Sequence, residues 1–288
     1  MRFSLGNLHT MLSLLPPLSR RSPGLVVVVT GASSGIGRAT ALLAAQERHH
    51  VVLVARGTEE LEKVAAACEE AGCASVAVET ADINDDESVA GVVAHTLAEH
   101  GRIDAVLHCA GIVTYGRTED TSEDDFASVV GTNLLGSATV ARHVIPVLRD
   151  QQEGDLVIVG SLLGHIAVPE MTPYVVSKWG VRALARQLKI ENNDLPQVRI
   201  SHVAPGSVDT EIYDNALDSA GMVNSAPPPT ISPERAARAV LGQVGSRQSE
   251  SQTAWINYAM IGAFRVAPAV WDRTVGPLFH LVSRRRAA

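Results

Sequence analysis

Length, composition and charge narrow the classes of protein that need to be considered. The chain has 288 residues, of which 46% are hydrophobic and 19% charged, so it can bury a sizeable core as a single α/β domain. Its formal net charge of −7 argues against nucleic acid as a partner. The three cysteines, Cys68, Cys73 and Cys109, show neither a disulfide framework nor zinc-ligand spacing. We therefore expect free thiols, a cytoplasmic compartment and no metal site.

Residues 1–23 form an N-terminal extension that stands apart from the rest of the chain. It contains Arg2, Arg20 and Arg21, no acidic residue and a mildly apolar middle that Pro16 and Pro17 interrupt. Such a composition fits a disordered extension, and a targeting or membrane-contacting segment is the alternative. No stretch of the chain reaches the ~18 consecutive apolar residues of a spanning helix.

From residue 24 onward, short apolar runs alternate with helical stretches. Strands are predicted at 25–30, 51–55, 75–79, 104–108, 155–160 and 198–203, and more weakly at 253–257. Helices are predicted at 35–48, 58–71, 85–99, 132–149, 172–192 and 232–244, with Asn84 and Glu87 as the start signal of the third. Continuous apolar strands are typical of sheets that helices cover on both faces. The pattern predicts an α/β fold with one doubly wound parallel sheet over residues 24–257.

The segment VTGASSGIG (29–37) joins the first strand to the first helix. Its Gly31-x3-Gly35-x-Gly37 spacing is one residue longer than the G-x-G-x-x-G dinucleotide fingerprint. A turn without side chains lets a pyrophosphate approach the helix N-terminus, and the hydroxyls of Ser33 and Ser34 add further contacts. The alternative interpretation is that the glycines merely permit a tight turn.

The residues after the second and third strands bear on which cofactor binds. A carboxylate after the second strand would bind a ribose 2′-hydroxyl, but the sequence has Arg56, which suits a 2′-phosphate. NADP(H) is therefore favoured and NAD(H) is the alternative, although Arg56 also fits a solvated surface position. Asp82, after the third strand, is placed either to accept from an adenine amino group or to cap a helix.

A second group of polar residues suggests proton transfer. Tyr174 and Lys178 are four residues apart, so both lie on one face of a predicted helix. A nearby ammonium group is expected to lower the pKa of a phenol, as an acid or base near neutral pH requires. Ser161 ends the fifth strand, where its hydroxyl can orient a carbonyl oxygen, and Asn133 is a polar residue in an apolar stretch.

These motifs together resemble the short-chain dehydrogenase/reductase family over residues 24–245. The resemblance implies a Rossmann-type domain with a seven-stranded parallel sheet, often assembled as a homodimer or homotetramer. It also implies catalytic roles for Asn133, Ser161, Tyr174 and Lys178. The cofactor contacts that it implies are Thr30, Gly31, Ser33, Ser34, Gly35, Ile36, Gly37, Arg56, Asp82, Ala110, Gly111, Tyr174, Lys178, Pro205, Gly206, Val208 and Thr210.

The family roles, carried over to these positions, describe carbonyl–alcohol interconversion with NADP(H). Tyr174 would exchange a proton with the substrate oxygen, and Ser161 would hold that oxygen. Lys178 would bind the nicotinamide ribose and lower the tyrosine pKa, while Asn133 would position a water molecule beside it. One departure is His108-Cys109-Ala110-Gly111, where the family usually has Asn-Asn-Ala-Gly; the lost asparagine contacts are expected to loosen the floor of the active site.

The substrate and the C-terminal segment are less clearly marked. Candidate residues for a hydrophobic carbonyl substrate are Leu162, His165, Met171 and Tyr213, and residues 206–231 are predicted to form a mobile lid. Residues 258–288 are apolar, aromatic and basic, and loosely resemble the tails of hydroxysteroid dehydrogenase-like members. They are expected to form a lid, a dimer contact or a peripheral membrane contact, with Pro268 and Pro277 breaking any continuous helix.

Four other functions remain open at this point. An NAD-dependent dehydrogenase of the same family would differ only in its cofactor. A cofactor-binding regulator, or a membrane-peripheral structural protein, would not need the Tyr174 and Lys178 pair. An epimerase or dehydratase on the related extended fold usually has a different glycine spacing and a larger C-terminal substrate domain.

Overall fold

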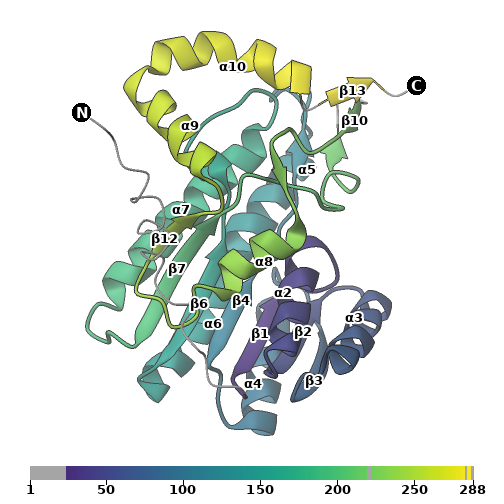
Figure 1. The fold of residues 1–288 in the computed structure, drawn as a ribbon, viewed down its shortest axis with the longest axis vertical. Helices are drawn as coiled ribbons and strands as arrows, with labels where there is room; N and C mark the ends of the chain where they lie inside the picture. Colours follow the sequence, from purple (N-terminus) through teal and green to yellow (C-terminus); the bar gives the residue numbers. More distant parts are fainter. Residues whose placement is uncertain (1–23, 219–221, 283, 287–288) are drawn as a thin grey trace, which may run out of the picture.

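Seven strands form one parallel sheet in the computed structural model, which describes residues 24–218, 222–282 and 284–286 (Figure 1). They are β1 (Val26–Thr30), β2 (His50–Ala55), β3 (Ser75–Thr80), β4 (Ala105–His108), β6 (Gly154–Val159), β7 (Val198–Ala204) and β12 (Glu250–Gln252). Their order is β12-β7-β6-β4-β1-β2-β3, with every neighbouring pair parallel. The predicted sheet is confirmed, whereas the predicted extension 1–23 lies outside the described residues.

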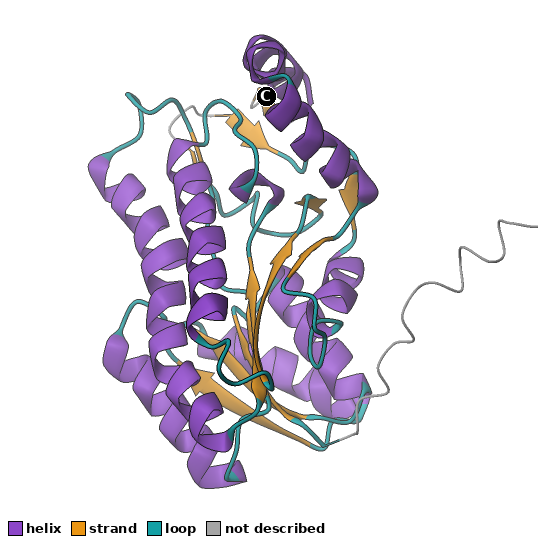
Figure 2. Ribbon diagram, turned by 90° about the vertical axis from the view of Figure 1, so that its left-hand side faces the viewer, coloured by secondary structure: helices purple, strands orange, loops and turns teal. Residues whose placement is uncertain are grey.

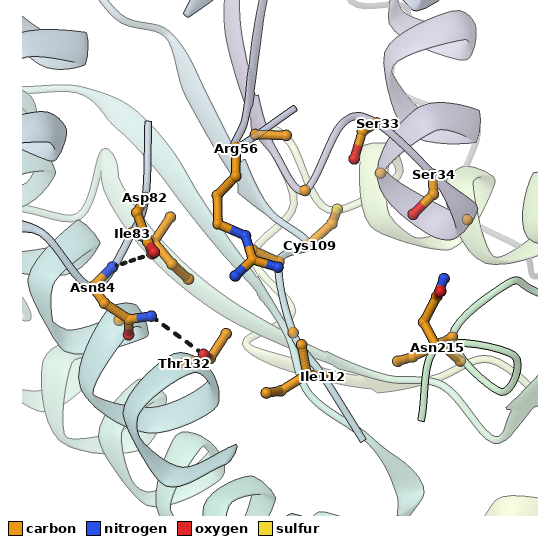
Figure 3. Close-up of a pocket in the computed structure, with 18 of the residues that line it drawn as sticks. Ser33, Ser34, Arg56, Asp82, Ile83, Asn84, Cys109, Ile112, Thr132 and Asn215 are labelled. Carbon is orange, nitrogen blue, oxygen red and sulfur yellow. Dashed lines mark hydrogen bonds between the residues drawn. The ribbon is translucent and has the colours of Figure 1, made fainter. Parts of the chain in front are cut away.

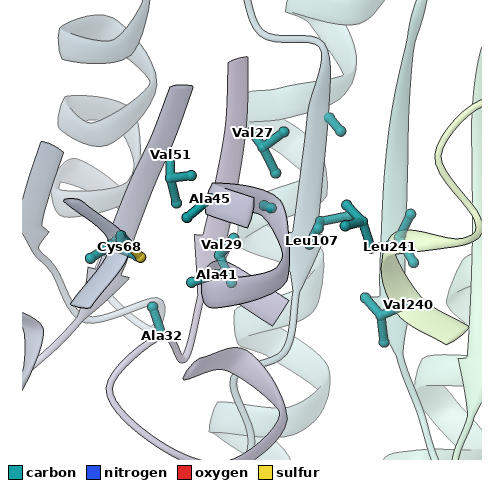
Figure 4. Close-up of a cluster of buried hydrophobic side chains, with 14 of the residues drawn as sticks. Val27, Val29, Ala32, Ala41, Ala45, Val51, Cys68, Leu107, Val240 and Leu241 are labelled. Atoms are coloured by element: carbon teal, nitrogen blue, oxygen red, sulfur yellow. The ribbon is translucent and has the colours of Figure 1, made fainter. Parts of the chain in front are cut away.

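Helices cover both faces of the sheet (Figure 2). The helices are α2 (Gly35–Gln46), α3 (Thr58–Ala71) and α8 (Pro233–Leu241) on one face, and α4 (Asp86–His100), α6 (Gly136–Gln151) and α7 (Thr172–Glu191) on the other. Successive valines of β1 point to opposite faces, as the pleat of a strand requires. Val27 and Val29 belong to the core cluster under α2 and α8 (Figure 4), and Val28 belongs to the opposite cluster. Burial on both faces explains why the strand is apolar throughout.

The order of the strands reverses beside β1, which pairs with β2 on one side and with β4 on the other. Val28 is in register with Val52 of β2 and with Val106 of β4. In doubly wound sheets, ligands bind in the crevice at this switch point, outside the carboxyl ends of the strands. A ligand site is therefore expected at the carboxyl ends of β1, β2 and β4.

The predicted helix at 132–149 is divided in the structure. An unpredicted helix, α5 (Glu123–Val130), leads into one π-helical turn, η2 (Gly131–Leu135), before α6 begins at Gly136. Such turns are rare and often occur at functional sites. Here the turn contains Asn133, one of the predicted catalytic residues.

Two local start and end signals differ from the prediction. α4 is capped by Asp85, whose carboxylate accepts the Ser88 N–H at 3.2 Å, so the Asn84 start signal is wrong by one residue. The weak strand predicted at 253–257 is also wrong, because β12 ends at Gln252 and a helix starts at Trp255. β12 is a short polar edge strand, and edge strands carry little of the apolar pattern on which the prediction depended.

The segment predicted as a mobile connection contains short paired strands among its described residues. β8 (Ser207–Val208) pairs with β11 (Thr230–Ile231), and β9 (Leu217–Asp218) pairs with β5 (Thr114–Tyr115). β10 (Met222–Asn224) pairs antiparallel with β13 (Arg284–Arg286) of the C-terminal segment. Backbone pairing thus attaches this connection to the body of the protein.

Two helices at the C-terminus lie over the carboxyl end of the sheet (Figure 1). They are α9 (Trp255–Val266) and α10 (Pro268–Val282), so the predicted boundary between residues 257 and 258 falls inside α9. Pro268 does separate two helices, but Pro277 lies within α10, contrary to the prediction. Among the described residues, no helix combines the length and the hydropathy needed to cross a bilayer.

Candidate active site

Two glycines of the turn between β1 and α2, Gly31 and Gly37, cannot be replaced by another residue without displacing backbone. Gly31 has φ +67°, and a Cβ there would lie 2.8 Å from the backbone N and Cα of Ala110. A Cβ on Gly37 would lie 2.0 Å from the carbonyl oxygen of Gly31. The turn is therefore packed tightly against itself and against β4, and its N–H groups remain close to any ligand in the crevice.

A cavity of about 980 Å³ opens at this turn. It is lined by the predicted residues Gly31, Ser33, Ser34, Gly35, Ile36, Gly37, Arg56, Asp82, Ala110, Gly111 and Thr210, together with others such as Cys109, Ile112 and Asn215 (Figure 3). The volume lies at the upper end of the range for small-molecule and cofactor sites. A cradle of side-chain-free backbone at a helix N-terminus, opening into a long cavity, fits a dinucleotide.

Arg56 and Asp82 lie along the wall of this cavity that β2 and β3 form. The Arg56 side chain follows the end of β2 and extends into the cavity (Figure 3). Asp82 accepts the Asn84 N–H at 2.9 Å through its Oδ1 atom and does not cap α4, so the capping alternative is wrong. Both residues line the cavity, and their contacts with an adenosine moiety stay a prediction.

The departure from the family pattern at His108 has a different effect from the predicted loosening. His108 is fully buried, with Nδ1 2.7 Å from the Thr30 hydroxyl and Nε2 2.9 Å from the Ser137 hydroxyl. Burial lowers the pKa of His108 to about 3, so the neutral ring joins β1, β4 and α6. Burial also raises the pKa of the neighbouring Cys109 to about 12, which keeps its thiol protonated.

Tyr174 and Lys178 come together on one face of α7, as predicted. The Lys178 Nζ atom lies 5.7 Å from the centroid of the Tyr174 ring and donates to the Val159 carbonyl at 3.2 Å. Burial lowers the pKa of Lys178 to about 8. Burial also raises the pKa of Tyr174, and a hydrogen bond with Ser161 offsets part of that increase. The prediction that Lys178 lowers the pKa of Tyr174 is therefore wrong for the protein without bound ligands, because burial of the phenol dominates.

Ser161 lies directly after β6, at the carboxyl edge of the sheet. Its Oγ atom accepts the Leu163 N–H at 3.0 Å, which fixes the hydroxyl at the start of the short 3₁₀ turn η3 (Leu162–Gly164). The same hydroxyl is hydrogen-bonded to Tyr174. The sheet and α7 therefore bring together Ser161, Tyr174 and Lys178 from separate parts of the chain.

Asn133 lies close to this group, and both the oxygen and the nitrogen of its side-chain amide form hydrogen bonds. Its Oδ1 atom accepts the Ile112 N–H at 2.9 Å, and its Nδ2 atom donates to the Ile112 carbonyl and the Ser177 hydroxyl, each at 2.9 Å. A Cβ on Gly111 would lie 3.0 Å from Asn133 Oδ1 and 3.5 Å from Lys178 Nζ. The π-helical turn thus places Asn133 next to the Lys178 ammonium, and Gly111 leaves room for both.

Of the four residues predicted after β7, only Thr210 lines the cavity. The Pro205 carbonyl accepts the Leu162 N–H at 2.7 Å, and a Cβ on Gly206 would lie 2.8 Å from Asn257 Oδ1. Val208 is buried in β8. These three residues position the segment that carries Thr210.

The predicted substrate residues separate into three places. Met171 and Tyr213 pack with Tyr174 in an apolar cluster that includes Tyr115 and Phe279. Leu162 belongs to a second cluster, beneath α9. His165 is buried beside Glu250. None of the four residues lines the cavity at the glycine turn, so their contacts with a substrate stay a prediction.

Phe279 is the residue of this site that the sequence did not single out. It extends from α10, is 8% exposed, and stacks on Tyr115 with a distance of 6.4 Å between ring centroids. The Trp271 indole donates to the Ala167 carbonyl at 2.8 Å and ties α10 to the loop after Ser161. The aromatic enrichment of residues 255–282 was the available signal, but only the fold shows which ring faces the site.

A doubly wound sheet, a glycine cradle at its switch point and a Ser161–Tyr174–Lys178 group beside the cavity define a nucleotide-binding oxidoreductase. The family model described as short chain dehydrogenase matches residues 25–220. The chain belongs to the short-chain dehydrogenase/reductase family of oxidoreductases, as its motifs indicated.

Several proteins of known sequence or structure are similar to this chain. Human dehydrogenase/reductase SDR family member 7 is 34% identical over 196 residues, which are 67% of this chain and 58% of that protein. The 3-oxoacyl-[acyl-carrier-protein] reductase FabG of Thermotoga maritima is 31% identical over 204 residues, 69% of this chain and 80% of that protein.

Two solved structures are also similar. An alcohol dehydrogenase from Thermococcus sibiricus, complexed with 5-hydroxy-NADP, has a TM-score of 0.69 and 30% identity, covering 79% of this chain and 95% of that one. A short chain dehydrogenase/reductase from Burkholderia phymatum, in complex with NAD, has a TM-score of 0.77 and 22% identity, covering 86% and 95%. The second likeness supports the fold alone.

Proposed function

We propose that the protein is an NADP(H)-dependent oxidoreductase that interconverts a carbonyl group and an alcohol on a hydrophobic substrate. The observation that carries this proposal is the group of Ser161, Tyr174 and Lys178, in which Lys178 lies against Gly111 of the cavity wall. Nicotinamide, when bound, supplies or accepts the hydride. The protein's own residues must then hold the substrate oxygen and move one proton.

The geometry suggests how the proton moves during reduction. The Tyr174 hydroxyl donates its proton to the substrate oxygen, and the Ser161 hydroxyl donates a hydrogen bond to the same atom. The Lys178 ammonium, close to the ring, stabilises the phenolate that remains. Asn133 holds the backbone at Ile112 and the Ser177 hydroxyl, which keeps this arrangement in place beside Lys178.

Arg56 supports NADP(H) over NAD(H). Its side chain extends into the cavity from the end of β2, where a ribose 2′-substituent is expected. Related structures carry an NADP analogue in one protein and NAD in another, so the family accommodates both. In the sequence Val54-Ala55-Arg56-Gly57 no acidic residue is adjacent to Arg56, so its guanidinium suits a phosphate.

A hydrophobic substrate is supported by the apolar cluster beside Tyr174. Met171, Tyr115 and Phe279 are each at least 90% buried there, and Tyr174, Ile212 and Tyr213 pack against them. Such a wall favours apolar carbonyl compounds over charged ones, because a buried unpaired charge is costly.

The proposal is tested by following NADPH oxidation with a panel of aliphatic, aromatic and steroid-like carbonyl compounds, each repeated with NADH. We expect turnover with NADPH on apolar members of the panel. Replacing Arg56→Gln should weaken NADPH binding by roughly 10- to 100-fold and leave NADH binding unchanged, because one charge-assisted contact is lost. A preference of the wild type for NADH would contradict the cofactor assignment.

A further inference from the structure

Three side chains from distant parts of the sequence meet outside the cofactor cavity. His165 follows the turn η3, His202 lies in β7, and Glu250 begins β12. One potential ligand atom from each lies within 4.8 Å of the other two. We call this group the His165–His202–Glu250 cluster. The two histidines are 4% and 2% exposed.

His202 is an unusual buried histidine. Neither of its ring nitrogens forms a hydrogen bond with a described residue, although both are buried. Its ring packs against Gly160, where a Cβ would lie 1.9 Å from Nε2, so the glycine makes room for it. Leaving a buried polar group unpaired costs about 1–3 kcal/mol. A ligand that accepts the lone pair of one ring nitrogen would remove the part of this cost that falls on that nitrogen.

His165 has a related conflict at its Nε2 atom. The Asn257 amide donates to the Ala204 carbonyl at 3.3 Å and to Gln252 Oε1 at 3.2 Å, which fixes the direction of the Gln252 amide. Gln252 Nε2 therefore faces His165 Nε2 at 3.1 Å as a donor, so that His165 Nε2 must present its lone pair.

The same nitrogen also faces a carboxylate. Glu250 Oε1 lies 3.1 Å from His165 Nε2, and a carboxylate can only accept. Two lone pairs therefore point at each other, and a cation between them would turn this repulsion into attraction.

We propose that the His165–His202–Glu250 cluster binds one Zn²⁺ ion through two imidazole nitrogens and one carboxylate oxygen. Ligand atoms of a tetrahedral zinc site, with bonds of ~2.0–2.2 Å, lie roughly 3.3 Å apart, close to the 3.1 Å between His165 and Glu250. Arg182 donates from Nε to Glu250 Oε1 at 2.7 Å and orients the carboxylate as an outer-shell partner.

The charges around the cluster restrict which ion it accepts. Arg182 pairs with Glu250, and Arg265 acts electrostatically on His165, so the surroundings are not strongly negative. A site of this kind relies on neutral nitrogen donors, which favours Zn²⁺ over Mg²⁺ or Ca²⁺. The ion would join β7 and β12 to the loop that begins at Ser161 and so stabilise that loop.

The test titrates ZnCl₂ into protein that has been treated with EDTA, by calorimetry and thermal unfolding, with Co²⁺ absorption as a report of tetrahedral geometry. We expect one equivalent to bind, to raise the melting temperature, and to be unaffected by Mg²⁺ in excess. Glu250→Gln and His202→Ala should each weaken Zn²⁺ binding by more than ~10-fold, because each removes a ligand. Failure of the wild type to bind one equivalent overturns the proposal.

A matched control separates the cluster from surface histidines. His95→Ala removes an exposed histidine that lies 3.3 Å from Glu79, and this variant should bind Zn²⁺ as the wild type does. The Glu250 side chain is 34% exposed, so Glu250→Gln should fold even where the substitution of buried His202 does not. Equal affinity of Glu250→Gln and the wild type for Zn²⁺ also overturns the proposal. Zn²⁺ binding by the wild type and by Glu250→Gln is measured without turnover, so both results are independent of the proposed oxidoreductase activity.

Discussion

The carboxylate of Glu211 lies on the N-terminal turn of α2, where its Oε2 atom accepts the Gly35 N–H at 3.1 Å. Its Oε1 atom accepts from the Arg38 guanidinium at 2.7 Å. Its own backbone N–H, together with Arg38 and the Gly35 N–H, holds the pKa of Glu211 below its usual value. A negative charge is therefore held beside the turn on which a cofactor pyrophosphate is expected to bind.

Replacing Glu211→Gln should tighten NADPH binding by roughly three- to tenfold. The neutral amide no longer repels the pyrophosphate or competes as strongly for the positive end of the helix dipole. Fluorescence titration with NADPH measures the effect. Glu234 of α8 also carries a carboxylate that interacts with Arg38. Glu234→Gln is therefore the control and should leave NADPH binding unchanged. Weaker binding by Glu211→Gln would show that the carboxylate supports the turn instead of opposing the cofactor.

The free energy of unfolding, measured in EDTA, should fall steeply as the pH drops from ~6.5 toward 4. Burial lowers the pKa of His108 to about 3, of His165 to about 4 and of His202 to about 3. The unfolded chain thus binds more protons than the native protein in this range, and each histidine removes about 1.4 kcal/mol per pH unit. Urea unfolding at several pH values measures the slope. His108→Asn should make the slope shallower, and an unchanged slope would contradict the account.

Phe279→Ala should raise KM for apolar carbonyl substrates about tenfold without changing NADPH affinity. The Phe279 ring packs in the apolar cluster beside Tyr174, stacks on Tyr115 and does not line the cavity at the glycine turn. Steady-state kinetics and NADPH titration distinguish the two effects. Leu278→Ala, at an exposed position of the same helix, is the control. Equal losses in both variants would mean that α10 acts only through its stability.

The helices α9 and α10 should bind vesicles that contain anionic lipid through their exposed apolar and basic side chains. Trp255 is 78%, Val266 86% and Leu281 80% exposed, and Arg265 and Arg273 are exposed on the same two helices. Apolar and basic side chains together favour the surface of a membrane. Flotation with liposomes measures the binding, and a Val266→Glu, Leu281→Glu variant should remain unbound. Equal flotation of this variant and the wild type would contradict a membrane contact.

The sheet and the reacting group could be predicted because their patterns are local or tightly spaced. Each pattern lies within a few neighbouring residues. Examples are the valine run of β1, the glycine turn, and the four-residue spacing of Tyr174 and Lys178. The π-helical turn at Asn133 could not be predicted, since it depends on how α5 and α6 pack and not on propensity.

Contacts between segments that are distant in the sequence could not be predicted. Phe279 reaches Tyr115, and His165 meets His202 and Glu250, only because the chain returns over the end of the sheet. The position of His165 near Ser161 in the sequence favoured a substrate role. The fold instead places its ring beside His202 of β7 and Glu250 of β12.

The central claim is that Tyr174 transfers the proton in carbonyl reduction. The most direct measurement compares wild type and Tyr174→Phe in kcat with NADPH and an active carbonyl substrate, with NADPH affinity measured in parallel. We predict that kcat falls about 10²- to 10⁴-fold while NADPH affinity is unchanged, because only the hydroxyl that donates the proton is removed. Turnover of Tyr174→Phe at the wild-type rate would contradict the mechanism.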